Sequence, residues 1–166
     1  MADKRLAFGV AAAIFLADQL SKWLVAGPLA LQSVGQIELL PFFRFTWVEN
    51  RGISLGLFQA SSEAGRWFLV AMTAGIAIAV AVWITRETRR GDQAALGMLL
   101  GGALGNILDR ARLGYVVDFA DLHFGDFRPF YIFNVADASI SIGVVILLLR
   151  AFLLKPEPPT ENVDNA

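Results

Sequence analysis

Cysteine is missing from the 166-residue sequence, and histidine occurs only once, at position 123. Without cysteine the chain can form neither a disulfide nor a thiolate nucleophile nor a thiolate metal site. A single imidazole also argues against a zinc hydrolase, because such sites usually collect two or three histidines. We therefore expect no metal and no cofactor, so that any hydrolytic chemistry falls to other side chains.

Charged residues are also scarce. Asp, Glu, Lys and Arg make up 17% of the chain, 56% of the residues are hydrophobic, and the formal net charge is -1. A nearly neutral chain without a Lys/Arg run among aromatic residues is not expected to bind nucleic acid. The composition is more apolar than that of an ordinary soluble domain and is typical of an integral membrane protein.

Four segments are predicted to span the membrane as helices, at about 6–26, 67–85, 93–110 and 133–154. The second is the clearest, with 19 uncharged residues between Arg66 and Arg86, close to the ~20 residues that a spanning helix needs. The first begins like a signal peptide, but its apolar pattern continues without a convincing cleavage site. The predicted fold is therefore mainly α-helical, with four transmembrane helices.

Four spans would place both termini on one side of the membrane. The presumed inner segments 1–5, 86–92 and 155–166 hold six Lys/Arg in 24 residues, against six in the 64 residues of the presumed outer segments. This density favours cytoplasmic termini. We expect residues 1–155 to form one domain and residues 156–166 to be a disordered cytoplasmic tail.

A small extramembrane β-element is predicted at about 36–59. Polar and apolar residues alternate over 43–49, as in a half-buried strand. The Asn50-Arg51-Gly52 turn followed by residues 53–58 suggests a hairpin that lies on the membrane surface.

Several polar residues lie within or beside the predicted helices. Asp18 and Lys22 are four residues apart and share a helix face, so they can form a structural ion pair or face a substrate. Gly97, Gly101 and Gly105 recur every four residues and predict close contact with a neighbouring helix, with Gly102 adding to the same groove.

Three aspartates are the candidate chemical groups. Asn106 and Asp109 end the third helix, Asn134 and Asp137 start the fourth, and Asp118 lies in the predicted loop 111–132. Two carboxylates in a partly desolvated pocket cannot both ionise cheaply, so one acts as a base and the other as an acid that together activate water. Spacing alone does not choose between Asp109 and Asp118 as the partner of Asp137. It also allows a purely structural reading in which Asn134 caps the fourth helix.

Five sequence blocks carry a resemblance to a known family. They are Asp18-Gln19-x-x-Lys22, Asn50-Arg51-Gly52-x-Ser54-x-Gly56, Gly101-Gly102-Ala103-x-Gly105-Asn106-x-x-Asp109-Arg110, Val116-Val117-Asp118-Phe119 and Phe133-Asn134-x-Ala136-Asp137. In this order, over nearly the whole chain, they resemble the conserved blocks of the bacterial lipoprotein signal peptidase, signal peptidase II.

The resemblance implies an aspartyl endopeptidase of the bacterial inner membrane with Asp118 and Asp137 as its catalytic pair. Its substrate would be a diacylglyceryl-modified prolipoprotein, cut just before the lipidated cysteine near the periplasmic face, and its other partner would be membrane lipid. The β-element would be a periplasmic cradle, and Asp109 a structural acceptor paired with an arginine. The substrate site is implied to include Asn50, Asn106, Arg110 and Asn134.

Two expectations complete this reading. We expect the protein to be a monomer. The alternative to a peptidase is a small proton-coupled transporter whose carboxylates relay protons, although the sequence has neither the internal repeats nor the broken helices of such carriers.

Overall fold

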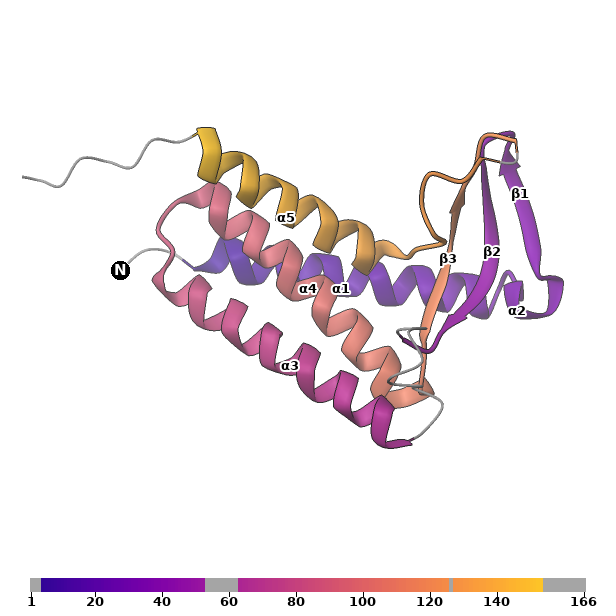
Figure 1. Ribbon diagram of the computed structural model, residues 1–166, viewed down its shortest axis with the longest axis horizontal. Helices are drawn as coiled ribbons and strands as arrows, with labels where there is room; N and C mark the ends of the chain where they lie inside the picture. Colours follow the sequence, from indigo (N-terminus) through magenta and orange to yellow (C-terminus); the bar gives the residue numbers. More distant parts are fainter. Residues whose placement is uncertain (1–3, 53–62, 126, 154–166) are drawn as a thin grey trace, which may run out of the picture.

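The computed structural model describes residues 4–52, 63–125 and 127–153, which form a helical bundle with a small sheet across one end (Figure 1). The helices are α1 (Arg5–Ala26), the single-turn α2 (Leu31–Val34), α3 (Glu63–Arg86), α4 (Arg90–Leu113) and α5 (Val135–Leu153). The strands are β1 (Gln36–Leu40), β2 (Phe43–Asn50) and β3 (Val116–Leu122). The four long helices correspond to the four predicted spans, and α3 and α4 extend a few residues beyond the predicted ends.

Three of the described helices, α1, α3 and α5, are long and apolar enough to cross a membrane. Their outward surfaces carry large exposed apolar side chains such as Ile78 on α3 and Phe152 on α5. The more polar α4 packs against all three of them. Its polar side chains therefore contact protein, which is the arrangement that buried polar groups require in an apolar bundle.

Small residues allow α4 to approach its neighbours closely. A Cβ atom added at Gly97 or Gly101 would collide with the α1 backbone at Ala7 or Ala11. The predicted glycine contact is thus present, and its partner is α1. Gly102 differs from the prediction, because it faces Ala136 on α5 and belongs to a separate contact.

The sheet is antiparallel in the order β1-β2-β3. β2 pairs with β1 on one edge and with β3 on the other, where Val48 lies opposite Asp118. The predicted strand at 43–49 is present as β2, and its described partners are β1 and β3. Residues 53–58, the partner that the predicted hairpin requires, lie outside the described residues. The two paired neighbours of β2 come from the segments before it and after α4.

The predicted loop 111–132 is also wrong in part, because it contains β3. All residues of β3 except Leu122 are buried. A strand that is covered on both faces lacks the alternation of polar and apolar residues by which a half-buried strand is recognised. Gly114 leads into it by ending α4 with a φ of 85°, a left-handed conformation that glycine adopts without strain.

The sheet is attached to the bundle by a second apolar core. Val25 at the end of α1, Leu31 on α2 and Phe119 on β3 are buried together there. The Phe45 ring of β2 meets Phe119 edge-on, with the ring centroids 5.4 Å apart. This packing holds the middle of β3 against the ends of the helices, where the polar residues gather.

Candidate active site

The start of α5 lies directly on β3. The backbones of Ala120 and Phe133 form an antiparallel bridge, in which the Ala120 N–H donates to the Phe133 carbonyl at 2.8 Å and the Phe133 N–H donates back at 3.1 Å. Asn134, the next residue, precedes the first turn of α5. The bridge therefore brings Asn134 beside Asp118, although 16 residues separate them in the sequence.

Asn134 caps α5 and also binds Asp118. Its Oδ1 accepts the Asp137 backbone N–H at 2.8 Å, and its own N–H donates to Asp137 Oδ2 at 3.3 Å, the reciprocal pattern of a capping box. Its Nδ2 donates to Asp118 Oδ1 at 2.6 Å. Asn134 therefore fits both the structural and the functional interpretation, because one fully buried residue binds both carboxylates, Asp118 through its side chain and Asp137 through its backbone N–H.

Two further asparagines complete what we call the amide cluster, consisting of Asp118, Asp137, Asn50, Asn106 and Asn134. Asn50 Nδ2, at the end of β2, donates to Asp118 Oδ2 at 3.0 Å. Asn106 Nδ2, on α4, donates to Asp137 Oδ1 at 2.8 Å. Among the described residues, no lysine or arginine forms an ion pair with either carboxylate.

Asp118 has the environment of a carboxyl group that can keep its proton near neutral pH. It is 2% exposed. Burial first, and then the nearby charge of Asp137, raise its pKa from 3.8 to about 7, against the opposing effect of the hydrogen bonds from Asn50 and Asn134. The two carboxyl groups of the amide cluster can therefore share one proton, as an acid and a base must.

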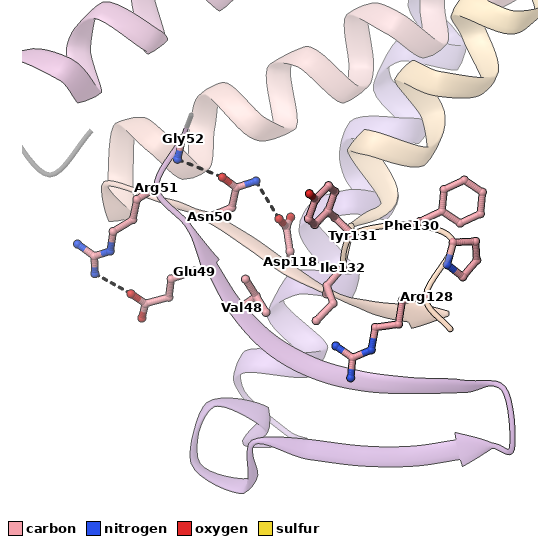
Figure 2. Close-up of a pocket in the computed structure, with 11 residues that line it drawn as sticks. Val48, Glu49, Asn50, Arg51, Gly52, Asp118, Arg128, Phe130, Tyr131 and Ile132 are labelled. Atoms are coloured by element: carbon pink, nitrogen blue, oxygen red, sulfur yellow. Dashed lines mark hydrogen bonds and ion pairs between the residues drawn. The ribbon is translucent and has the colours of Figure 1, made fainter. Parts of the chain in front are cut away.

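Two cavities open onto these carboxyl groups. The larger, of about 980 Å³, lies between the end of β2 and the loop at 128–132, and Asp118 faces it beside Asn50 (Figure 2). The smaller, of about 240 Å³, includes Asp137 and apolar residues of α5 such as Ile142. Phe130 and Tyr131 line both cavities. An extended peptide could therefore approach the Asp118–Asp137 pair through the larger cavity, and an apolar group could approach it through the smaller cavity.

A second polar group, the lysine cluster, consists of Lys22, Asp18 and Asp109. Lys22 Nζ lies 2.8 Å from Asp18 Oδ2 and 2.8 Å from Asp109 Oδ2, and all three residues are buried. The predicted pairing of Asp18 and Lys22 is therefore present. Asp109 pairs with this lysine, so the expected pairing with an arginine is wrong.

The carboxylates of the lysine cluster also bind backbone groups. Asp18 Oδ1 accepts the Ala136 N–H at 3.0 Å, and Asp109 Oδ2 accepts the Val117 N–H at 3.2 Å. These bonds fix the first turn of α5 and the start of β3 to α1 and α4. Each accepting carboxylate therefore positions the segment that carries one residue of the amide cluster's carboxyl pair.

Arg110 lies between the two clusters without an ion pair to either. Its Nη1 donates to the Asn106 carbonyl at 3.5 Å, and its charge acts on Asp137, Asp118 and Asp109. The backbone of Arg110 is bound by α3, because Arg66 Nε donates to the Arg110 carbonyl at 2.8 Å. Arg110 thus supplies positive potential close to the amide cluster.

Sequence reasoning missed the loop 128–132 as part of the site. Its aromatic pair Phe130-Tyr131 sits just before a predicted helix, and Tyr131 is 97% exposed. An exposed aromatic residue next to predicted polar site residues was the available signal. In the described part of the chain, no group of three or more His, Cys, Asp or Glu side chains is arranged to hold a metal ion.

Comparison with solved structures gives the class of protein. The chain is similar to a bacterial membrane enzyme solved by the in meso method at 1.9 Å resolution, with a TM-score of 0.75 and 30% identity over 91% of this chain and 94% of that chain. A second such structure, at 2.3 Å resolution, gives a TM-score of 0.73 and 29% identity over 92% and 93%. The fold is that of a multi-pass bacterial membrane enzyme.

Comparison of sequences gives the family. The family model described as Signal peptidase (SPase) II matches residues 10–153. The lipoprotein signal peptidase of Rhizorhabdus wittichii is 56% identical over 99% of this chain and 99% of that protein. That of Sphingopyxis alaskensis is 61% identical over 90% of this chain and 87% of that protein. The chain belongs to the signal peptidase II family.

Proposed function

We propose that this signal peptidase removes signal peptides from prolipoproteins by using Asp118 and Asp137 to activate water against the scissile peptide carbonyl. The observation that carries the proposal is the amide cluster. Two carboxyl groups are joined through Asn134, one with its pKa raised to about 7, and both face cavities. This arrangement suits general acid–base catalysis without a covalent intermediate.

The proposed reaction needs one proton on the pair at the start. The ionised carboxylate takes a proton from water, and the water oxygen attacks the carbonyl carbon. At the same time the protonated carboxyl donates its proton to the carbonyl oxygen. The tetrahedral intermediate collapses when the carboxyl that took the proton from water passes it to the nitrogen of the leaving amine and the C–N bond breaks. The other carboxylate takes back a hydroxyl proton as the carbonyl reforms, so the pair again holds one proton. Asn50, Asn106 and Asn134 hold the two carboxyl groups in place, and Arg110 favours the negative charge that develops.

The finer description of the substrate belongs to the same proposal. We infer a diacylglyceryl-modified prolipoprotein, cut just before the lipidated cysteine. The larger cavity supports binding of the peptide, and the smaller apolar cavity beside Asp137 supports proximity to lipid. We further infer that the enzyme acts as a monomer.

We also infer four spans in the bacterial inner membrane, with α4 as the fourth. At the end of the bundle away from the sheet, Lys4 Nζ donates to the Glu87 carbonyl, and Arg150 Nε lies 2.5 Å from Asp92 Oδ1. These contacts support placing both termini on the cytoplasmic side and the sheet with the amide cluster at the periplasmic face. Residues 1–155 would then be one domain, and the proposed tail 156–166 lies outside the described residues.

The test is cleavage of a lipid-modified prolipoprotein by the purified enzyme in detergent, with and without a chelator. Asp118→Asn and Asp137→Asn should each abolish cleavage, while Asp92→Asn, at the opposite end of the bundle, should retain it. Cleavage by either of the first two variants at the normal rate would refute the proposed carboxyl pair. A loss of activity with the chelator would refute the metal-independent mechanism.

A further inference from the structure

Arg128 occupies one end of the larger cavity. It lines the cavity opposite the Glu49–Arg51 pair, with Asp118 between them (Figure 2). Its side chain is 49% exposed. A long cation therefore borders the space in which the peptide is proposed to lie, although no step of the proposed hydrolysis uses it.

The two arginines of the cavity differ in how their charges are compensated. Arg51 Nη2 lies 2.6 Å from Glu49 Oε2, so this pair is locally neutral. Arg128 Nη2 lies 3.8 Å from Asp121 Oδ2, and the same oxygen accepts a closer bond from Arg44 Nε at 2.8 Å. Within these described contacts, one carboxylate serves two guanidinium groups, so the charge of Arg128 is only partly balanced.

Asp121 is the carboxylate that contacts the Arg128 guanidinium. Its side chain is fully buried on β3, and Thr46 Oγ1 also contacts its Oδ2 at 3.3 Å. The carboxylate is therefore fixed by β2, while the exposed part of the Arg128 side chain has no other ion pair among the described residues and can meet a ligand. A planar guanidinium with several donors is suited to carboxylate recognition.

We infer that Arg128 is a specificity-determining residue that binds an acidic side chain of the substrate peptide. This inference rests on the proposed function, because it needs the peptide to lie in the larger cavity. The acidic side chain would bind at the Arg128 end, away from Asp118, since two carboxylates close together repel each other. An amide in place of the carboxylate keeps the shape of the side chain but loses the charge.

The experiment uses lipid-modified prolipoproteins that differ only by Asp or Asn at one position, with that position moved along both sides of the cleavage site. We expect the native enzyme to prefer Asp over Asn at one position by about threefold to tenfold in kcat/KM, through KM. Arg128→Gln should remove the preference by raising KM for the Asp substrate to that for the Asn substrate. Arg112→Gln is the matched control, because Arg112 is exposed and does not line the cavity.

Reversing the charge of Arg128 distinguishes the loss of a specific contact from the loss of the folded enzyme. Arg128→Glu should prefer Lys over Asn at the same position, a gain that an unfolded enzyme cannot show. A preference for Asp that survives in Arg128→Gln, an equal loss in Arg112→Gln, or no position with a preference for Asp would overturn the inference. So would a dependence on Arg128 that appears only when anionic phospholipid is added, because the ligand would then be a lipid headgroup.

The two proposals fail in different ways. If Asp118→Asn still cleaves the substrate, the proposed carboxyl pair is refuted whatever Arg128 does. If Asp118→Asn is inactive but the charge preference does not depend on Arg128, only the inference about Arg128 fails.

Discussion

The lysine cluster and the amide cluster lie side by side and are built from the same acidic residue type, yet their electrostatics differ. In the lysine cluster, Asp18 and Asp109 are each 2.8 Å from the Lys22 ammonium. In the amide cluster, Asp118 and Asp137 receive hydrogen bonds from asparagine amides at 2.6 to 3.0 Å. One pair of carboxylates shares a buried cation, and the other pair is held by neutral donors.

This difference separates a structural role from a chemical one. A buried carboxylate beside an ammonium stays ionised and accepts backbone N–H groups, so it fastens segments together. A buried carboxyl held only by amides can keep or release its proton. Asn106 joins the clusters, because its Oδ1 accepts from Lys22 at 3.3 Å while its Nδ2 donates to Asp137. The lysine cluster therefore helps to position the amide cluster through Asn106.

The largest expected effect is on catalysis. Asp118→Asn should lower kcat by about a thousandfold or more, because the pair loses a carboxyl that exchanges its proton. The thermal unfolding midpoint should change little, since the variant loses one of the two amide hydrogen bonds to this side chain but also removes a buried ionisable group. Asp109→Asn should show the reverse pattern, with a lower unfolding midpoint and partial activity. Equal loss of activity in the two variants at equal stability would remove the distinction between the clusters.

Removal of the buried cation should have the largest effect on stability. Lys22→Met leaves Asp18 and Asp109 buried without their partner and should lower the free energy of unfolding by about 3–5 kcal/mol. Unfolding in detergent followed by tryptophan fluorescence measures this change. Adding Asp18→Asn and Asp109→Asn to the same chain should restore part of the loss. A triple variant less stable than Lys22→Met would contradict the assignment of Lys22 as the cation that offsets these two buried carboxylates.

Steric pressure on the lysine cluster should have a smaller effect. A Cβ atom at Gly105 would collide with the Asp18 carboxylate, so Gly105→Ala should lower the free energy of unfolding by about 1–3 kcal/mol. Gly75→Ala on α3 is the matched control, because open space surrounds that position. The control should be neutral or stabilising by about 0.4–1 kcal/mol. Similar behaviour of the two variants would show that α4 and α1 can separate locally.

The pH dependence should follow the amide cluster. Because the pKa of Asp118 is raised to about 7, the shared proton should leave the pair as the pH rises through that value. We expect kcat/KM to fall by about tenfold per pH unit above it. The unfolded carboxyl has its ordinary pKa of 3.8. Between these two values Asp118 ionises in the unfolded state while it keeps its proton in the folded state, so stability also falls as the pH rises. A flat activity profile from pH 6 to 9 would argue against a protonated partner.

The smallest effect is expected outside both clusters. The Glu49–Arg51 pair is largely exposed, with 60% exposure of the Arg51 side chain. Arg51→Gln should therefore lower the free energy of unfolding by less than about 1 kcal/mol, because solvent screens such pairs. Thermal unfolding at low and high salt measures it. If Arg51→Gln lowered the free energy of unfolding as much as Lys22→Met, solvent exposure would not make the Glu49–Arg51 pair weaker than the buried lysine cluster.

The helices were predictable because their signal is local. The apolar runs of α1, α3 and α5 and the glycine spacing of α4 are set by composition and by the period of one helix. The strand β3 was missed because burial on both faces removes the alternation on which the prediction of β2 relied. The pairing of β2 with β3 was not predicted either, since β3 follows α4 and reaches β2 only through tertiary packing.

The candidate site divides in the same way. By itself the sequence determined that cysteine chemistry is excluded, that carboxylates are the candidate reactive groups, and that Asp18 and Lys22 share a helix face. Only the tertiary structure decided that Lys22 also pairs with Asp109, and that Asn50 and Asn134 reach Asp118. The physical reason is that a side chain's type is local, whereas its ionisation depends on burial and on partners brought from distant segments of the chain.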